Sequence, residues 1–233
     1  MQLAKVAVVT GASRGIGRAV ALGLAEDGYD VVLIARTENK LIALENQIKK
    51  FGVKSKIICT DITDFDFLTQ ALNAVIKEWG RVDVLVNNAG IYRDGTLEAS
   101  LDDYQAVFEV NLKAQLVMIK TILPVMQKQK SGLIVNVASI SGKVGYSASG
   151  AYCSSKFALV GLSESLYNEY SSQGIKITSI CPSYVATDMA KDAGAEIPEN
   201  EMIQTADILQ TIRWLLQLSP YAFVKEIVLD IAP

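Results

Sequence analysis

The chain has 233 residues, half of them apolar and a fifth charged, which is the composition of an ordinary globular protein. Its net charge of -3 argues against a nucleic-acid-binding surface, and no stretch reaches the roughly 18 apolar residues that would cross a bilayer. The N-terminus lacks the basic and apolar regions of a signal peptide, so we expect a cytoplasmic protein. The absence of histidine excludes Ser-His-Asp hydrolysis and histidine-ligated zinc catalysis, and we expect no metal site.

Apolar, β-branched segments recur along the chain and are separated by longer segments with a helical pattern. Continuous apolar strands of this kind suit a parallel sheet that is covered on both faces, with a helix crossing between consecutive strands. The sequence predicts one α/β domain over residues 1–233, with a Rossmann-type doubly wound parallel sheet of about seven strands flanked by helices. In chain order the predicted strands are residues 6–10, 30–35, 55–60, 82–87, 133–138, 175–181 and 226–231.

The first predicted strand continues into TGASRGIG, residues 10–17, and then into a helical pattern. Gly11 permits a tight turn, Gly15 lets the backbone approach a diphosphate, and Gly17 lets the helix pack on the sheet. The N-terminus of the helix offers free N–H groups to the phosphates. Because a strand precedes this loop and a helix follows it, the sequence predicts a nucleotide-binding loop. Its expected contacts also include Ser13, Arg14 and Ile16.

The end of the second predicted strand bears on the choice between NAD and NADP. An acidic residue there would bond the ribose 2′-hydroxyl and repel a 2′-phosphate. This chain has Ala35 at that place, followed by Arg36, and Arg14 lies in the glycine-rich loop. Two guanidinium groups that converge on one phosphate favour NADP(H), because such hydrogen bonds are charge-assisted and often bidentate. The alternative is that each arginine is a solvated surface charge.

The spacing of the glycines in TGASRGIG resembles the signature Thr-Gly-x-x-x-Gly-x-Gly of the short-chain dehydrogenase/reductase family. The resemblance extends over nearly the whole chain, to about residue 188. It implies that Asp61, with Ile62 beside it, bonds the adenine amino group. It also implies that NNAG, residues 87–90, shapes the cofactor wall, although such a segment in isolation would indicate a turn. The expected contacts there are Asn88, Ala89 and Gly90.

Tyr152 and Lys156 are four residues apart and would share one face of a helix. A phenol keeps its proton to about pH 10, and a nearby ammonium would lower its pKa toward the working range of an acid-base catalyst. Such a pair alone is often a surface pair, but Ser139 precedes it at the family's spacing and at the end of a predicted strand. The resemblance implies that Ser139 bonds the substrate oxygen and that Lys156 also bonds the nicotinamide ribose.

Asn111, in VNLKAQL, matches the fourth member of the family's catalytic set. The resemblance implies that it holds a water in the proton path through a local break in its helix. The segment PSYVATDM, residues 182–189, resembles the family's Pro-Gly-x-x-x-Thr segment, with Ser183 in place of the usual glycine. Its implied contacts to the nicotinamide end of the cofactor are Pro182, Val185 and Thr187.

The substrate pocket is expected to be apolar and partly aromatic, and a segment at about 188–205 is expected to form a short lid. The alternative is that several of the pocket residues pack against the cofactor or a neighbouring subunit. Besides Ser139 and Tyr152, the expected lining residues are Ile140, Val144, Tyr146, Tyr184 and Met189.

The expected function is reduction of an aldehyde, ketone or diketone by NADPH, with a small carbonyl or alcohol as the substrate. A first alternative is a 3-oxoacyl-[acyl-carrier-protein] reductase, which TGASRGIG favours and the C-terminal KEIVLDIAP, lacking a glycine-rich ending, disfavours. A second is an NADPH-binding sensor or interaction protein without turnover. The resemblance also implies a homodimer or homotetramer, and the helices expected in 101–130 and 151–173 could form the interface.

Overall fold

A sheet of seven parallel strands in the order β3-β2-β1-β4-β5-β6-β7 forms the centre of the computed structural model, which describes residues 4–231. The strand order reverses between β1 and β4, and ligands bind at such a switch point in open α/β sheets. The single-domain Rossmann-type fold is therefore confirmed. The strands are β1 (Val6–Thr10), β2 (Asp30–Ala35), β3 (Ser55–Cys59), β4 (Val84–Asn87), β5 (Gly132–Val137), β6 (Ile175–Pro182) and β7 (Glu226–Leu229).

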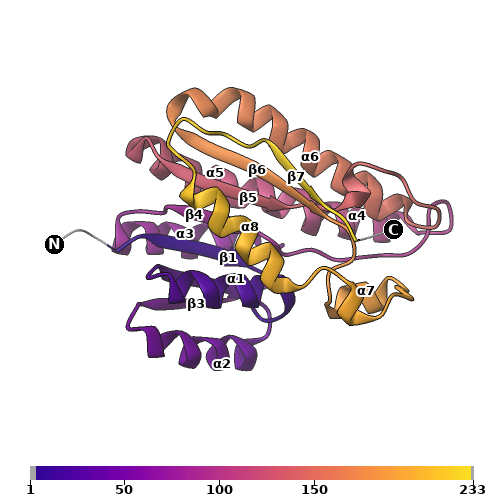
Figure 1. Cartoon of the computed structure of the whole chain (residues 1–233), viewed down its shortest axis with the longest axis horizontal. Helices are drawn as coiled ribbons and strands as arrows, with labels where there is room; N and C mark the ends of the chain where they lie inside the picture. The colour runs from indigo at the N-terminus through magenta and orange to yellow at the C-terminus, as the bar shows by residue number, and fades with distance from the viewer. Residues whose placement is uncertain (1–3, 232–233) are drawn as a thin grey trace.

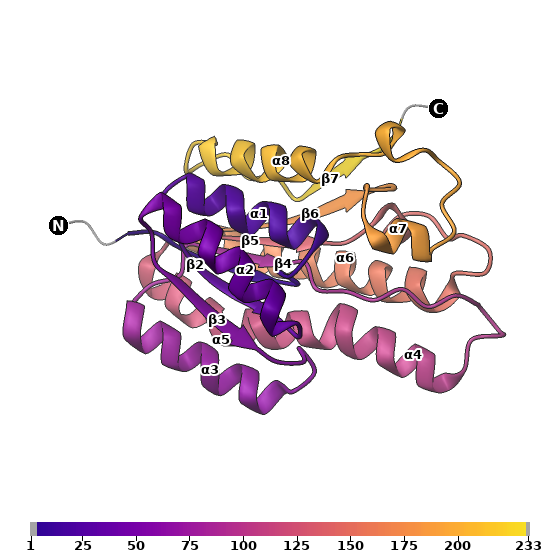
Figure 2. The ribbon, with the colours of Figure 1, turned by 90° about the horizontal axis from the view of Figure 1, so that it is seen from below.

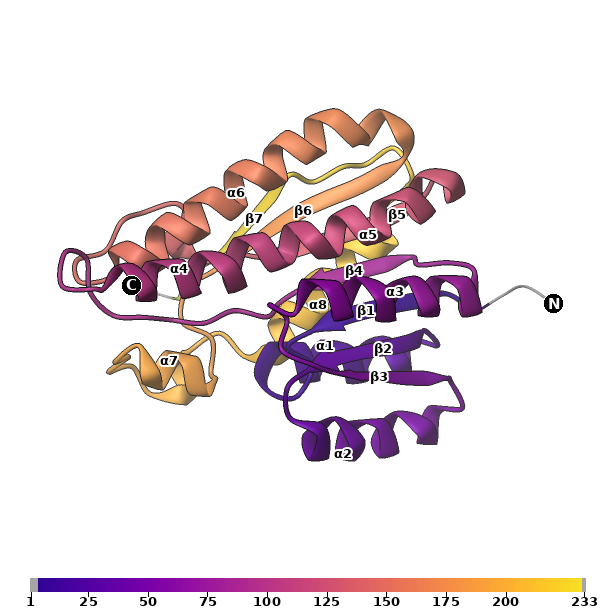
Figure 3. The same cartoon turned by 180° about the vertical axis from the view of Figure 1, so that it is seen from behind.

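Helices cover both faces of the sheet (Figure 1). One face carries α1 (Gly15–Glu26), α2 (Glu38–Ile48) and α8 (Thr205–Gln217), which Figure 2 shows together. The other face carries α3 (Phe65–Trp79), α5 (Ala114–Gln129) and α6 (Gly150–Tyr170), which lie in front in Figure 3. The remaining helical segments are α4 (Leu101–Phe108), a π-turn (Glu109–Lys113), α7 (Asp188–Asp192), and 3₁₀ turns at Lys49–Phe51, Ile140–Gly142, Ser171–Gln173 and Glu199–Glu201.

The apolar core consists of two layers, one on each face of the sheet. Successive residues of β1 alternate between the layers, since Val9 packs with the α1 and α8 side and Val8 with the α3 and α5 side. Every residue of β1 and β4 is buried, which explains why both strands are apolar up to their last residues, Thr10 and Asn87. The predicted strand ends differ by up to two residues, and the edge strand β7 stops at Leu229 rather than at residue 231.

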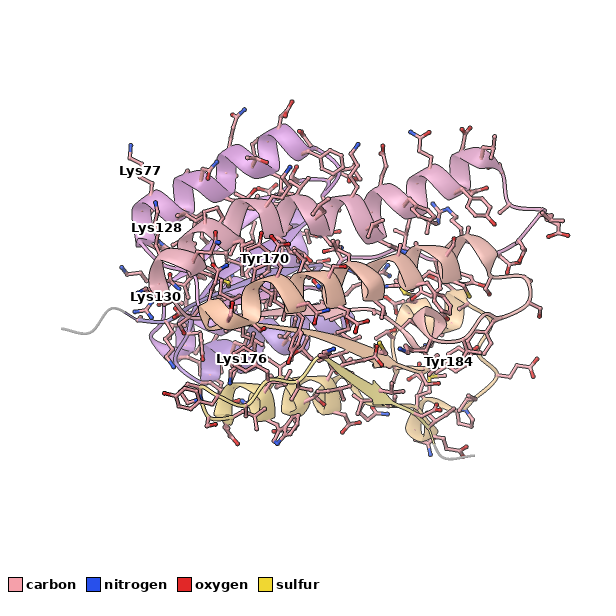
Figure 4. All side chains as sticks on the ribbon, turned by 90° about the horizontal axis from the view of Figure 1, so that it is seen from above. Lys77, Lys128, Lys130, Tyr170, Lys176 and Tyr184 are labelled. Carbon is pink, nitrogen blue, oxygen red and sulfur yellow. The ribbon has the colours of Figure 1, made fainter. Side chains whose placement is uncertain are left out.

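The two ends of the sheet differ in what they present to solvent. Lys77, Lys128, Lys130 and Lys176 lie at the end where the strands begin, and Tyr184 lies at the opposite end (Figure 4). The short helix α7 is found at the same end as Tyr184, beyond the carboxyl ends of the strands (Figure 1). Across residues 4–231, no helix combines the length and the apolar character that a membrane crossing would need.

Candidate active site

A cavity of about 1180 Å³ opens at the carboxyl ends of the strands, at the switch between β1 and β4. Every residue predicted to bind cofactor lines it, with the exception of Gly17. Of the predicted catalytic set, Ser139, Tyr152 and Lys156 line the cavity and Asn111 does not. The fold therefore brings together segments that are up to about 175 residues apart in the chain, and it does so where this class of sheet binds its ligands.

Thr10, the last residue of β1, ties the glycine-rich loop to the NNAG segment. Its Oγ1 accepts hydrogen bonds from the backbone N–H groups of Asn88 and Ala89, both at 2.9 Å. In return, the Nδ2 of Asn88 donates to the carbonyl of Thr10 at 2.9 Å. Gly11 has φ +66°, and a Cβ there would lie 2.7 Å from the same Nδ2. Asn88 thus braces the loop, and only glycine fits at Gly11.

The N-terminus of α1 faces the cavity without a side-chain cap. Arg14, the N-cap residue, makes no capping hydrogen bond, and the first turn contains no acidic residue. The free N–H groups and the positive end of the helix dipole therefore suit an anionic group such as a diphosphate. Gly15 lies at the cavity wall, whereas Gly17 is buried beneath the loop against the carbonyl of Gly11. Gly17 therefore allows close packing against the glycine-rich loop rather than against the sheet, and it is not a lining residue.

Each of the two arginines predicted to bind a 2′-phosphate pairs with a carboxylate. Arg36 Nη1 lies 3.5 Å from Asp61 Oδ2, and Arg14 Nη1 lies 2.9 Å from Asp188 Oδ2. Neither partner was predicted, and the two guanidinium groups are paired with different carboxylates rather than directed to one common point. Both ion pairs are largely exposed, and such pairs contribute at most about 1 kcal/mol. Either arginine can therefore exchange its carboxylate for a phosphate at small cost.

Asp61 is held in place by its own loop. Its Oδ1 accepts hydrogen bonds from the backbone N–H of Thr63 at 2.9 Å and from the Thr63 hydroxyl at 2.7 Å. Partial burial raises the pKa of Asp61, but these hydrogen bonds and the Arg36 charge outweigh it and lower the pKa below its usual range. Asp61 is therefore a fixed carboxylate at the end of the cavity that contains Arg36.

Tyr152 and Lys156 lie on the first turns of α6, both buried, and Ser139 lies just after β5. The Lys156 ammonium is 5.6 Å from the centre of the Tyr152 ring. Its Nζ donates a hydrogen bond to the carbonyl of Val137 at 2.9 Å, which fixes the lysine against the end of β5. A buried hydroxyl, phenol and ammonium thus meet at the cavity wall, which is a set of groups able to bind a carbonyl oxygen and exchange a proton with it.

Burial sets the pKa values of this pair. It raises the pKa of Tyr152 to about 12, although a hydrogen bond with Ser139 acts in the opposite direction. It lowers the pKa of Lys156 to about 8. The expectation that Lys156 lowers the pKa of Tyr152 is therefore wrong for the protein chain by itself. The physical reason is that loss of hydration dominates for both groups, while the ammonium is hydrogen-bonded to Val137.

Asn111 lies in the π-turn between α4 and α5, so the predicted break in its helix is present. Its side chain is buried and points into the protein. Oδ1 accepts from the N–H of Ile91 at 2.8 Å, and Nδ2 donates to the carbonyl of Ile91 and to Ser155 Oγ, both at 3.0 Å. The Ser155 hydroxyl donates in turn to the carbonyl of Tyr152 at 2.7 Å. Asn111 thus connects the loop after NNAG to the catalytic helix.

The substrate side of the cavity differs in part from the prediction. Ile140, Tyr146, Tyr184 and Met189 line it, but Val144 does not and is half exposed, because the chain leaves the cavity after the 3₁₀ turn at Ile140–Gly142. Sequence reasoning missed Tyr92, whose ring packs edge-on against Tyr152 with the centres 5.3 Å apart. Within the segment predicted to form a lid, residues 188–190 and 193 line the cavity.

These features are those of a Rossmann-type oxidoreductase site, with an uncapped helix N-terminus at one end of the cavity and a Tyr-Lys pair at the other. The chain belongs to the short-chain dehydrogenase/reductase family, since the model of the family described as short chain dehydrogenase matches residues 5–198. It is accordingly an oxidoreductase that acts on CH–OH groups.

Known relatives align with almost the full length of this chain. The 3-oxoacyl-[acyl-carrier-protein] reductase FabG of Staphylococcus aureus (strain Mu50) is 36% identical over 225 residues, which cover 92% of either protein. Among solved structures, a β-ketoacyl-[ACP] reductase (FabG) from Bacteroides thetaiotaomicron is 42% identical, with a TM-score of 0.87 over 99% of this chain and 97% of that one. A metagenomic short-chain oxidoreductase in complex with NADP is 32% identical, with a TM-score of 0.86 over 99% of both chains.

Proposed function

We propose that this protein reduces the carbonyl group of an aldehyde, ketone or diketone to an alcohol and uses NADPH as the reductant. The observation that carries the proposal is the position of Tyr152, which is buried on the cavity wall beside Ser139 and has the Lys156 ammonium 5.6 Å from the centre of its ring. A sensor without turnover would not need a protonated phenol and an ammonium held away from water, both at a cost in solvation.

The proposed cofactor would lie along the cavity at the carboxyl ends of the strands. The uncapped N-terminus of α1 would hold the diphosphate, and Arg14 and Arg36 would hold the 2′-phosphate. The relative solved with NADP supports this choice, and so does the absence of an acidic residue at the end of β2. Further contacts would come from Ser13, Ile16, Asp61 and Ile62 toward the adenosine half, and from Gly90, Pro182, Val185 and Thr187 toward the nicotinamide half.

The chemistry divides between cofactor and protein. A bound NADPH would supply the hydride for the carbonyl carbon, and the residues of the chain would handle the oxygen and the proton. Tyr152 donates its proton to the carbonyl oxygen, and the Ser139 hydroxyl donates a hydrogen bond to the same atom as negative charge grows there. Lys156 stabilises the phenolate that remains, and Asn111 fixes the π-turn against the helix that carries both groups. The proposed role of Asn111 in holding a water stays a prediction.

A 3-oxoacyl thioester on acyl carrier protein is the second candidate substrate. The FabG relatives, at 36% and 42% identity over nearly the whole chain, favour it. The same residues would serve, since the 3-oxo group is a ketone. Comparing kcat/KM for an acetoacetyl thioester with that for small ketones separates the two candidates.

We also propose that the protein is cytoplasmic and assembles as a homodimer or homotetramer through α4, α5 and α6. Leu101 on α4 and Phe157 on α6 support this interface, since these large apolar side chains are 86% and 45% exposed. A second copy would remove them from water.

Thermal unfolding with NADPH or NADH, followed by assays of Tyr152→Phe, tests the main proposal. A ligand at 100 times its dissociation constant adds about 2.7 kcal/mol of stability, which is a clear shift in Tm. We expect a larger shift with NADPH, and loss of turnover in Tyr152→Phe with NADPH affinity within a few-fold of wild type. Near-normal turnover in that variant would refute the mechanism, and an equal shift with NADH would refute the cofactor assignment.

A further inference from the structure

Two loops that are distant in the sequence join to form one wall on the substrate side of Tyr152. Gly95 N–H donates to the carbonyl of Ala148 at 2.6 Å, and Gly150 N–H donates to Thr96 Oγ1 at 3.1 Å. Ala148 has φ +54°, a left-handed conformation that costs a non-glycine residue free energy. The hydrogen bonds around Ala148 must offset this cost, so they hold the wall in one conformation.

Three polar side chains on this wall line the cavity, and we call Tyr92, Asp94 and Ser149 the acceptor wall. The Tyr92 hydroxyl donates to Asp94 Oδ1 at 3.1 Å and lies 3.1 Å from Ser149 Oγ. Burial and the neighbouring Asp94 raise the pKa of Tyr92, although the Ser149 hydrogen bond opposes them, so the phenol keeps its proton. With that proton directed to Asp94, Ser149 must be the donor to the Tyr92 oxygen.

Both hydroxyl hydrogens of the acceptor wall are therefore used in hydrogen bonds within the wall, and only acceptor atoms remain available to a ligand. Among the described residues, no protein group bonds the second carboxylate oxygen of Asp94, which is exposed at the cavity mouth. Lone pairs also remain on Ser149 Oγ. A group that binds this wall must bring its own hydrogen, as a hydroxyl does, whereas a second carbonyl or an ether oxygen cannot.

The charges of the cavity point the same way. Five basic residues line the cavity. Four of them lie around the predicted cofactor site: Arg14 in the glycine-rich loop, Arg18 on α1, Arg36 just after β2, and Lys40 on α2. The fifth is Lys156. Arg93 follows Tyr92 in the chain but is directed to Asp103, 3.5 Å away, and does not line the cavity. Lys156 is buried and donates to the carbonyl of Val137, so the exposed charge on the substrate side is the negative charge of Asp94. That charge disfavours a carboxylate or phosphate on the substrate.

Building on the proposed function, we propose that the substrate is a small, neutral hydroxy-carbonyl compound, with its hydroxyl one or two carbons from the carbonyl. The acceptor wall binds the hydroxyl while Tyr152 and Ser139 bind the carbonyl oxygen; the edge-on contact of Tyr92 with Tyr152 places the two sites side by side. The carbonyl carbon accepts a hydride from NADPH and its oxygen accepts the proton of Tyr152. The products are a diol and NADP⁺.

The experiment compares kcat/KM for 3-hydroxybutan-2-one and 3-methoxybutan-2-one at saturating NADPH. Both ketones carry an electron-withdrawing oxygen beside the carbonyl, but only the first has a hydrogen to donate. A hydrogen bond to a charged group corresponds to about ten- to a hundredfold, so we expect wild type to prefer the hydroxyketone by at least about tenfold. Tyr92→Phe and Asp94→Ala should reduce this preference toward unity.

Two matched variants serve as controls. Tyr104→Phe removes a phenol that donates to the carbonyl of Thr96 at 3.2 Å, and Asp102→Ala removes an exposed carboxylate on α4; neither residue lines the cavity. Both should keep the wild-type preference. Equal efficiencies for the two ketones in wild type, or an unchanged preference in both Tyr92→Phe and Asp94→Ala, would overturn the assignment. So would turnover restricted to an acetoacetyl thioester, whereas inactivity toward every carbonyl compound would overturn the proposed function itself.

Discussion

The hydroxyl of Ser155 offers a sharp test of how the catalytic helix is held. Ser155 is fully buried, and in the sequence it lies between Tyr152 and Lys156. It accepts a hydrogen bond from Asn111 Nδ2 at 3.0 Å and donates one to the carbonyl of Tyr152 at 2.7 Å. Replacing it with alanine removes both contacts at once. It also leaves an N–H of Asn111 buried without this acceptor, where water does not reach it.

The magnitude follows from that unpaired donor. A buried polar group left unsatisfied costs about 1–3 kcal/mol, and a chain of this length loses about 2–4 °C in Tm for each kcal/mol. Because Asn111 would no longer connect the π-turn to α6, we also expect kcat to fall about tenfold or more. The Kd for NADPH should change by less than about threefold, since Ser155 does not line the cavity.

Ser154→Ala is the matched control. Its hydroxyl also donates to the carbonyl three residues earlier, that of Ala151 at 3.0 Å, but Ser154 is exposed and has no contact with Asn111. Denaturant unfolding, steady-state kinetics and NADPH titration of both variants give the comparison. Equal behaviour of Ser154→Ala and Ser155→Ala in stability and kcat would refute the positioning role of Ser155.

Three further predictions follow from the cofactor and catalytic residues. Arg36→Asp should shift the ratio of kcat/KM values from NADPH toward NADH by at least about tenfold, because it removes a cation and adds a charge that repels the 2′-phosphate; an unchanged ratio would show that the phosphate binds elsewhere. Gly11→Ala should lower both the free energy of unfolding and NADPH affinity, since φ +66° and the Asn88 amide leave no place for a Cβ; wild-type values in unfolding and titration would contradict this. Lys156 has a pKa of about 8 in the fold against an ordinary 10.5, so the unfolded chain binds more protons between these values. The free energy of unfolding of wild type minus that of Lys156→Met should therefore rise by about 1.36 kcal/mol per pH unit from pH 8 to 10. Denaturant unfolding across that range checks this, and a difference that does not change with pH would show that the lysine is solvated.

The fold could be predicted because its cause is local in the sequence. Strands buried on both faces are mostly apolar, so β1 and β4 are recognisable without knowledge of their neighbours. The glycine-rich loop is predictable from the spacing of its glycines between a strand and a helix, although the contacts that exclude a Cβ at Gly11 come from the distant Asn88 and Ala89. Strand ends were less certain, because β7 pairs with β6 alone and its length depends on that single neighbour.

The site could be predicted only as far as residue type and spacing determine it. Tyr152 and Lys156 share a helix, so their proximity was predictable. The pairing of Arg14 with Asp188 joins residues 174 positions apart, and nothing in the local sequence indicates it. Tyr92 was missed for the same reason, because its contact with Tyr152 depends on how two loops meet. Its position two residues after NNAG was the available signal, since that segment ends at the cavity.

The proton balance of the site also depends on the fold. A lysine near a tyrosine lowers the pKa of the phenol when both are hydrated and the ammonium faces the hydroxyl. Here both are buried, and Lys156 donates to Val137, so Tyr152 holds its proton more firmly than a free tyrosine does. The protonated phenol is the form that the proposed reduction uses, because it donates its proton to the carbonyl oxygen. Oxidation of an alcohol needs the phenolate, which the chain alone disfavours, so a positive charge brought by the oxidised nicotinamide ring would have to offset burial. The cofactor therefore has to complete the electrostatics of the site, because burial alone leaves Tyr152 a weaker acid than a free tyrosine.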